Sequence, residues 1–282
     1  MKQNFESLFT RRNPNYEFLL SRMREAIGVD EVTFEDITAT NLRSFKEYMS
    51  GRVAANSLKT YFAVLKGAIR EMALDGLVKN ARCVDVLKSK NEPQQNVSLT
   101  NDEVERMWKY YCKLPKDKKH KLTRNVLALF LIEAYTGARG CDVKDFKPEN
   151  ISNNLLTYVS KKTHTLTKVI AHQRLPALFK DIPDDDIHRM TKNRIIKDAA
   201  KKCGIVDIVT IYYHGKQRSE PKYKYLGMHC ARRSFITNLI DMNVPISTVS
   251  KMAGHGDINM TQRYYSNNKL QIPEEALSFF NS

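Results

Sequence analysis

The chain has 282 residues, 42% of them hydrophobic, and is therefore long enough for two ordinary domains with at least one substantial core. Its 46 lysine and arginine residues outnumber 31 aspartate and glutamate residues, which gives a formal net charge of +15. Such an excess favours a polyanionic partner, nucleic acid first, although ribosomal, membrane-surface and merely over-charged proteins share it.

Cysteine usage and hydropathy argue against several other classes of protein. The five cysteines are odd in number, widely spaced and without a CxxC pair, so neither a disulfide framework nor a cysteine-based zinc site is indicated. The first residues, MKQNFESLFTRRNPN, lack the apolar core of a signal peptide, and the apolar run VLALFLI (126–132) is too short to span a bilayer. We therefore expect a cytoplasmic protein with no membrane partner.

From Tyr16 to about residue 80, apolar residues recur at the spacing of amphipathic helices. The three stripes are Tyr16, Leu19, Met23 and Ala26; Leu42, Phe45 and Met49; and Leu58, Phe62, Leu65, Ile69 and Met72. Thr40 and Ser57 are the expected N-caps, and Gly28 and Gly76 stand where helices commonly end. The first predicted helix begins near Tyr16, so few residues precede it.

Four basic residues line or precede the third of these helices: Arg52, Lys59, Lys66 and Arg70. Each alone is explained equally well as a solvated charge opposite an apolar face, but together they can follow a phosphate backbone. We therefore predict a helical DNA-binding domain over residues 1–90. A polar linker that contains Pro93 follows at 91–98.

A second domain is predicted over residues 99–282, beginning where Thr100 and Glu103 have the spacing of a capping box. Its predicted helices lie around 101–112, 124–136, 191–203, 229–242 and 246–253. Residues 155–171 form a predicted hairpin with arms LLTYVS and TKVIAH, and 208–225 form a second, basic hairpin or loop. The predicted fold class is mainly α with a small β-hairpin or sheet, in an N-terminal helical domain and a mixed α/β domain.

Familiar nucleotide and zinc-protease motifs are absent: the sequence has no GxxxxGK[ST], no GxGxxG after a strand and no HExxH. The acidic run at 184–186 could hold a metal with His188. Because it follows Pro183, a solvated turn leading into a helix explains it more readily. We expect neither a metal nor a cofactor.

The stretch MHCARRSFITNLIDM places Arg232 in line with the apolar residues Phe235, Ile236 and Leu239. A guanidinium in that stripe needs an anionic partner, and His229, one turn earlier, can converge with it on one point. The alternative is an arginine that reaches off the helix end to pair with an internal acid. This stretch alone supports both interpretations equally.

Two other basic residues have candidate roles of the same kind. Arg139 follows a turn that Gly137 permits, and Asp142 is close enough in sequence to orient it or to form a structural salt bridge with it. Lys162 occupies the turn of the first hairpin, where its flexible stem can reach a backbone phosphate or simply solvent.

The stretch AGHGDINMTQRYYS (253–266) closes a short helix at Gly254, continues with His255 and leads into a helix that Asp257 can cap. Tyr264 and Tyr265 lie on different sides of that helix, and each side also carries other apolar residues. Periodicity alone therefore does not choose between the two tyrosines.

The order of Arg139, Lys162, HCAR (229–232), GH (254–255) and Tyr264 resembles that of the tyrosine recombinases, also called phage integrases. The resemblance covers about 97–270, and the helical first half is similar to the family's core-binding domain in pattern. It implies a site-specific recombinase, or integrase, that cleaves and rejoins double-stranded DNA through a 3′-phosphotyrosyl intermediate and a Holliday junction. It further implies a tetramer on two DNA sites and no need for metal or ATP.

The resemblance also implies a role for each motif residue. Arg139 and Arg232 would neutralise the nonbridging oxygens of the phosphate, and Lys162 would protonate the departing 5′ oxygen. His229 and His255 would hydrogen-bond the phosphate, and His229 is also the candidate acceptor of the tyrosine proton.

The nucleophile implied by the resemblance is Tyr264, which stands nine residues after the second histidine. Asp142 would hold the basic groups of the site in place. For two of these residues, Lys162 and Tyr264, a neighbouring residue of the same type is an alternative. The hairpin turn lacks the family's usual glycine and offers Lys161 beside Lys162, and Tyr265 adjoins Tyr264.

Two other functions would use related residues: a type IB topoisomerase that relaxes supercoiled DNA without exchanging strands, and a non-catalytic DNA-binding regulator. The compact helical first half and the amphipathic segment IPEEALSFF (272–280) favour the recombinase. We interpret about 270–282 as a tail that docks on a neighbouring protomer or, almost equally well, as a helix that packs on its own domain.

Overall fold

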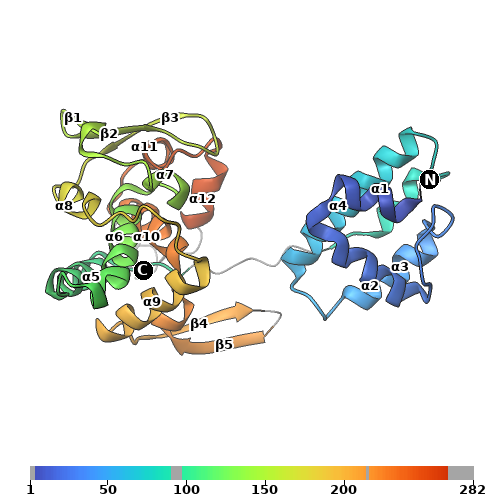
Figure 1. Ribbon diagram of the computed structural model, residues 1–282, viewed down its shortest axis with the longest axis horizontal. Helices are drawn as coiled ribbons and strands as arrows, with labels where there is room; N and C mark the ends of the chain where they lie inside the picture. The colour runs from blue at the N-terminus through green and yellow to red at the C-terminus, as the bar shows by residue number, and fades with distance from the viewer. Residues whose placement is uncertain (1–3, 90–96, 214–215, 266–282) are drawn as a thin grey trace, which may run out of the picture. The chain divides into compact units, whose positions relative to one another are not determined.

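The computed structural model of the protein describes residues 4–89, 97–213 and 216–265. The chain divides into two compact units, one built mainly from residues 4–89 and the other mainly from residues 97–265 (Figure 1). We call them the N-terminal unit and the C-terminal unit.

Helices build the N-terminal unit. They are α1 (Phe5–Arg12), η1 (Pro14–Tyr16), α2 (Glu17–Ile27), α3 (Ala39–Met49), α4 (Ala55–Leu74) and η2 (Ala81–Val86), where η denotes a 3-10 helix. The three predicted stripes supply most of one core, which Phe5, Leu8 and Phe9 of α1 complete. The expectation that the first helix begins near Tyr16 was wrong. The stripe of α1 is short, and Asn4 caps the helix by accepting the Ser7 N–H at 2.8 Å.

The predicted helix starts in this unit were displaced, whereas the predicted stops were confirmed. Thr38, not Thr40, caps α3 by accepting the Asn41 N–H at 3.2 Å. Helix α4 begins without a side-chain cap after Ala54, so Ser57 lies inside its first turn. Gly28 ends α2 in the left-handed conformation with φ 73°, and Gly76 follows α4 at φ 73°. Glycine adopts this conformation without the steric cost that other residues meet.

The C-terminal unit combines helices with two small antiparallel sheets. Its helices are α5 (Asn101–Lys113), α6 (Lys118–Thr136), α7 (Gly140–Val143), η3 (Pro148–Asn150), α8 (Leu175–Phe179), α9 (Arg189–Lys202), η4 (Lys222–Tyr225), α10 (Met228–Asp241), α11 (Ile246–Met252) and α12 (Asn259–Tyr265). One sheet has the order β1 (Ile151–Ser152), β2 (Leu155–Val159) and β3 (Leu166–Ile170), and the other pairs β4 (Ile208–Tyr213) with β5 (Lys216–Pro221). The predicted mainly α fold class and the first hairpin are confirmed.

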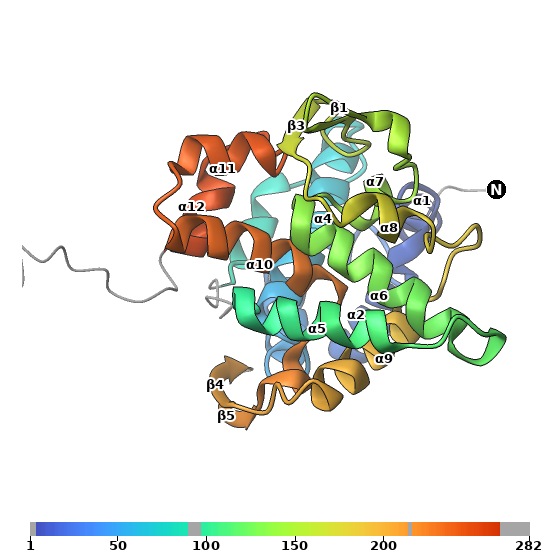
Figure 2. The same cartoon turned by 90° about the vertical axis from the view of Figure 1, so that its left-hand side faces the viewer.

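Helix α6 lies at the centre of the C-terminal unit. It begins at Lys118, earlier than predicted, because Asp117 caps it by accepting the His120 N–H at 2.8 Å. Residues 126–132 are buried on every side, as expected for a helix that is apolar all round. Helix α10 packs along α6, and α5, α8 and α9 also contact α6 (Figure 2).

The two sheets lie at opposite ends of the C-terminal unit. Both views show β1–β3 with α7 and α11 at one end, and α9 with β4 and β5 at the other (Figures 1 and 2). At the entry to the unit, Thr100 and Glu103 form the predicted capping box, with the Thr100 N–H donating to the Glu103 carboxylate at 2.7 Å. Within the described residues, no helix is both long and apolar enough to cross a membrane.

Candidate active site

The C-terminal end of α6 is the point where the predicted site residues meet. Arg232 of α10 donates to the carbonyl of Gly137, directly after α6. Arg139, two residues further on, donates through Nη1 and Nη2 to the carbonyl of Gly254, at 3.3 Å each, beside His255. Three motifs that are distant in the sequence are therefore held together by hydrogen bonds.

Arg232 lies in the apolar stripe of α10 as predicted and is only 2% exposed. Helix α10 can pack this closely against Gly137 only because glycine has no Cβ: a Cβ there would lie 2.4 Å from the Phe235 ring. The φ of 66° at Gly137 is left-handed, a conformation that glycine adopts without steric cost. Glu133, buried one turn before Gly137, is the internal acid near the arginine. Burial raises the pKa of Glu133 to about 8, although the charges of Lys192 and Arg232 oppose the shift.

Asp142 and Arg139 were predicted to orient each other or to form a salt bridge. They form no direct ion pair among the described residues. Instead, Arg139 Nη1 donates to Ser160 Oγ at 2.9 Å, and Ser160 Oγ donates to Asp142 Oδ2 at 3.3 Å. Asp142 Oδ1 accepts the backbone N–H of Lys161 at 2.8 Å. The carboxylate thus reaches the arginine through a serine.

The two lysines of the hairpin turn have different surroundings. Lys161 Nζ pairs with Asp145 Oδ2 at 2.6 Å. Lys162 forms no ion pair within the described part of the chain, and its charge is one of those that lower the pKa of His229. Lys162 therefore remains available for a substrate near His229, and this favours it over Lys161.

Both histidines lie beside the arginines, and both are shifted toward the neutral form. Desolvation is the first cause for His229, followed by the charges of Arg233 and Arg232, and together they bring its pKa well below the usual range. Desolvation, Arg232 and Arg139 lower the pKa of His255 to about 4. His255 Nδ1 lies 2.8 Å from Thr261 Oγ1 of α12, which fixes its ring.

Helix α12 contains both candidate nucleophiles, Tyr264 and Tyr265. Their side chains lie outside the described residues, as does the whole of the predicted tail at about 270–282. The start of α12 agrees with the prediction, since Asp257 Oδ1 accepts the Asn259 N–H at 2.9 Å.

In the N-terminal unit, the candidate DNA-binding residues Lys59, Lys66 and Arg70 share one face of α4, because they are spaced by seven and four residues. Arg70 lies 3.6 Å from Asp85 in an exposed pair. Arg52 precedes α4 and is held by Tyr48, whose carbonyl accepts Arg52 Nη1 at 2.7 Å and whose ring lies 4.1 Å below its guanidinium.

Within the acidic run at 184–186, Asp186 forms ion pairs with two lysines. Asp186 pairs with Lys144 at 2.9 Å and with Lys192 at 3.1 Å. His188 caps α9 by accepting the Met190 N–H.

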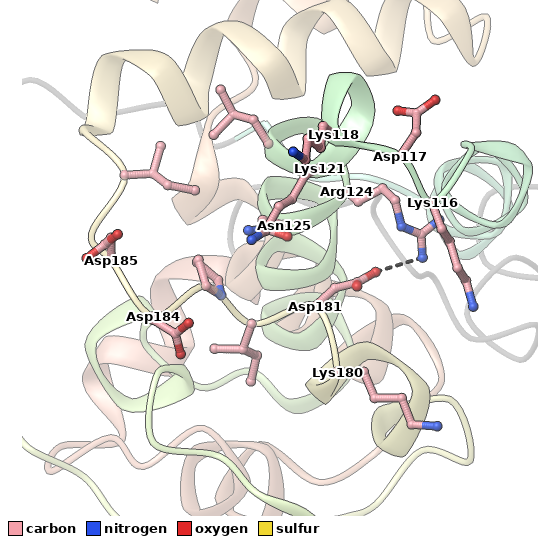
Figure 3. Close-up of a pocket in the computed structure, with 14 residues that line it drawn as sticks. Lys116, Asp117, Lys118, Lys121, Arg124, Asn125, Lys180, Asp181, Asp184 and Asp185 are labelled. Carbon is pink, nitrogen blue, oxygen red and sulfur yellow. Dashed lines mark hydrogen bonds and ion pairs between the residues drawn. The ribbon is translucent and has the colours of Figure 1, made fainter.

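A surface pocket of about 690 Å³ adjoins this run at the N-terminal end of α6 (Figure 3). Its wall contains the ion pair of Arg124 with Asp181, at 2.7 Å. The helix rises about 1.5 Å per residue, so its 19 residues separate this pocket from the candidate active site at the other end.

The sequence matches the phage integrase family over residues 66–271, well over half of the chain. The chain belongs to the phage integrase family. Residues 6–85 also match the phage integrase SAM-like domain. A search of curated proteins found no match.

Solved structures of integrases and recombinases share this fold. A XerH site-specific recombinase bound to a palindromic difH substrate has a TM-score of 0.67 and 17% identity, covering 95% of this chain and 80% of the other. A lambda integrase dimer bound to a core site has a TM-score of 0.65 and 16% identity, covering 96% and 95%. The Tn1549 transposon integrase with circular intermediate DNA has a TM-score of 0.65 and 14% identity, covering 100% of both chains.

Sequence reasoning missed two polar residues that contact predicted site residues, Ser160 and Thr261. Both are fully buried, and each hydrogen-bonds a predicted site residue. Ser160 directly precedes the two turn lysines, which was its only signal in the sequence.

Proposed function

We propose that this integrase is a site-specific DNA recombinase that cleaves and rejoins double-stranded DNA through a 3′-phosphotyrosyl intermediate. The observation that carries the proposal is the meeting of Arg139, Arg232, Lys162 and two histidines at the end of α6. The helix that carries Tyr264 follows directly. The DNA-bound state of the XerH and lambda integrase structures supports the same substrate class.

In this mechanism, the phenol oxygen of Tyr264 attacks the scissile phosphorus. The new tyrosine O–P bond forms as the P–O5′ bond breaks, and Lys162 gives a proton to the departing 5′ oxygen. A phenol has a pKa of about 10 and is a weak nucleophile toward an anionic diester. Arg139 and Arg232 would stabilise the charge on the nonbridging oxygens, and removing one such preorganised donor typically costs about 3–4 kcal/mol.

The lowered pKa values of His229 and His255 support a role for neutral imidazoles before DNA binds. A neutral ring can accept a proton, so His229 can take the one released by the tyrosine. Once the phosphate is bound, its negative charge favours the protonated imidazole. Binding of the DNA phosphate therefore makes the His229 imidazole a stronger base.

We infer that neither a metal nor ATP takes part. The two arginines can supply the charge stabilisation for which other phosphoryl-transfer sites use metal ions. The phosphotyrosyl bond retains the energy of the broken diester, so rejoining requires no external energy source. We further infer that the N-terminal unit contacts DNA through α4 and that four protomers assemble on two sites.

Covalent capture tests this proposal. A duplex site is first selected from a random library by binding to the full chain. Nicked versions of that duplex are then incubated with the protein in EDTA without ATP, and the DNA-linked peptide is mapped by mass spectrometry. We expect an adduct at Tyr264 that Tyr264→Phe abolishes and Tyr265→Phe does not.

Each other result has a defined meaning. An adduct at Tyr265 moves the nucleophile by one residue and contradicts the assignment of Tyr264. Binding without an adduct on any nicked duplex supports a DNA-binding regulator. Relaxation of supercoiled plasmid without strand exchange between two selected sites supports a topoisomerase.

A further inference from the structure

Ser160 stands between two charged side chains and has no contact with solvent. It follows the last residue of β2 and is 0% exposed. Its backbone is fixed on both sides, since its N–H donates to the Thr165 carbonyl at 2.9 Å and its carbonyl accepts the His164 N–H at 2.8 Å. The hydroxyl therefore has little freedom to move.

The directions of the hydrogen bonds at Ser160 follow from chemistry. A guanidinium has only donors and an ionised carboxylate only acceptors. The hydroxyl must accept from Arg139 Nη1, at 2.9 Å, and give its single proton to Asp142 Oδ2, at 3.3 Å. Both bonds involve a charged group, which makes them stronger than bonds between neutral groups.

These contacts leave one edge of Arg139 available. Nη1 donates to Ser160 Oγ and to the Gly254 carbonyl, and Nη2 donates to the same carbonyl. Of the five N–H groups of the guanidinium, Nε–H and one N–H of Nη2 have no bond to the described residues. Two such donors on one edge match two oxygens of a phosphate.

We propose that Ser160 is a positioning residue that orients Arg139 toward the scissile phosphate by linking it to Asp142. The inference rests on the proposed function. The two oxygens of Asp142 have different partners. Oδ2 accepts the hydrogen bond from Ser160, which contacts Arg139, and Oδ1 accepts the backbone N–H of Lys161 in the turn that contains Lys162. Loss of the serine hydroxyl therefore affects charge neutralisation by Arg139 and leaves proton donation by Lys162 intact.

Ser160→Ala separates these two contributions when it is tested on chemically modified duplexes of the selected site. On the ordinary phosphodiester we expect cleavage to be slowed by about 10- to 100-fold, as for a misplaced catalytic group. On a methylphosphonate, one charged oxygen is replaced by a neutral methyl group, so orientation of Arg139 matters less. The difference between Ser160→Ala and the unaltered protein should then largely disappear.

A duplex with a 5′-bridging phosphorothiolate at the scissile position tests the other contribution, proton donation by Lys162. Its sulfur leaves as a thiolate, which needs no proton because a thiol has a pKa of only about 8.5. This substrate should rescue Lys162→Ala but not Ser160→Ala. The proposal is overturned if Ser160→Ala cleaves the phosphodiester at the original rate, if the methylphosphonate does not rescue it, or if the phosphorothiolate does.

Ser234→Ala is the matched control for the loss of a buried hydroxyl. Ser234 is also 0% exposed, accepts one bond from the Leu99 N–H and donates one to the Cys230 carbonyl. We expect both variants to lower the melting temperature similarly and only Ser160→Ala to show the substrate-dependent defect. The same defect in Ser234→Ala would assign it to general destabilisation.

A DNA-free measurement keeps this proposal separate from the proposed function. In protein labelled with ¹⁵N-arginine, a guanidinium held by Ser160 should give an Arg139 Nη signal protected from exchange. Because the Gly254 carbonyl still accepts from both Nη groups, protection of that signal should fall in Ser160→Ala rather than vanish, and it should be unchanged in Ser234→Ala. If the unaltered protein forms no adduct, the proposed function fails while this measurement still decides the positioning. An unchanged signal in Ser160→Ala overturns it.

Discussion

At the scale of single residues, the carboxyl group of Glu133 links stability to pH. Burial raises its pKa from 4.5 to about 8, with Lys192 and Arg232 opposing the shift. Well below pH 4.5 the group is neutral in both the folded and the unfolded state, so its contribution to stability is fully present. As the pH rises to about 8, Glu133 ionises in the unfolded chain but not in the folded one. The free energy of unfolding therefore falls, by a few kcal/mol at most.

Glu133→Gln keeps the size of the side chain and removes this titration. The difference in free energy of unfolding between Glu133→Gln and the unaltered protein should therefore shift in favour of the variant from pH 5 to pH 8. Urea denaturation at several pH values measures it. Taking the difference cancels the opposite effect of His229 and His255, whose lowered pKa values make stability fall as the pH falls. A difference that is constant with pH would contradict the prediction.

Gly137 is a second residue at which a small change should be costly. Its φ is 66°, and an added Cβ would meet two carbons of the Phe235 ring at 2.4 and 2.7 Å. We expect Gly137→Ala to destabilise the C-terminal unit by about 1–3 kcal/mol, measured by thermal unfolding. Gly67→Ala in α4 is the control, because its Cβ would meet nothing within 4 Å and alanine favours a helix. A loss of stability in Gly67→Ala equal to that in Gly137→Ala would argue against the clash.

The environment of a single residue can be predicted from the sequence only where neighbouring residues in the chain determine it. The buried position of Arg232 could be predicted because helical periodicity places it in an apolar stripe. The bridge through Ser160 could not, because it exists only when α7 and the end of β2 meet in the fold. The same holds for Glu133, whose pKa depends on burial among α6, α9 and α10 rather than on its neighbours in sequence.

At the scale of elements, a buried ion pair attaches the β4–β5 hairpin to α5. Lys222, at the exit of β5, donates to Glu103 Oε2 at 2.5 Å, and their side chains are 12% and 4% exposed. Lys222→Ala leaves the carboxylate buried without its cation, so we expect a loss of about 3 kcal/mol in the free energy of unfolding. Arg194→Ala is the comparison, since its pair with Asp198 spans 3.9 Å with side chains 68% and 62% exposed. That variant should change stability by less than about 0.5 kcal/mol, and equal losses would contradict this ranking.

Elements themselves were predictable where periodicity or capping chemistry was strong. The capping box of α5 and the arms of the β2–β3 hairpin appear as expected from Thr100, Glu103 and the two β-rich runs. Helix boundaries were less predictable, since Thr38 and Thr40 are both competent caps two residues apart and the structure uses the first.

At the scale of the whole molecule, the net charge of +15 makes DNA affinity depend on salt. If α4 follows the phosphate backbone, each lysine that contacts a phosphate contributes about 0.9 to the slope of log K against log salt concentration. The double variant Lys59→Gln, Lys66→Gln should therefore reduce the slope by about 2 on the selected duplex, measured by fluorescence anisotropy.

Lys113→Gln combined with Lys118→Gln gives the control, because it removes the same formal charge from exposed positions on α5 and α6. These lysines lie in the part of the C-terminal unit away from the candidate active site, at the N-terminal end of α6. A reduction in net charge alone acts at long range and is screened within about 10 Å at ordinary salt, so it should lower the slope much less. If both double variants flatten the slope equally, the charge of the whole protein rather than the α4 face determines binding, and α4 loses its assignment as a DNA-contacting helix.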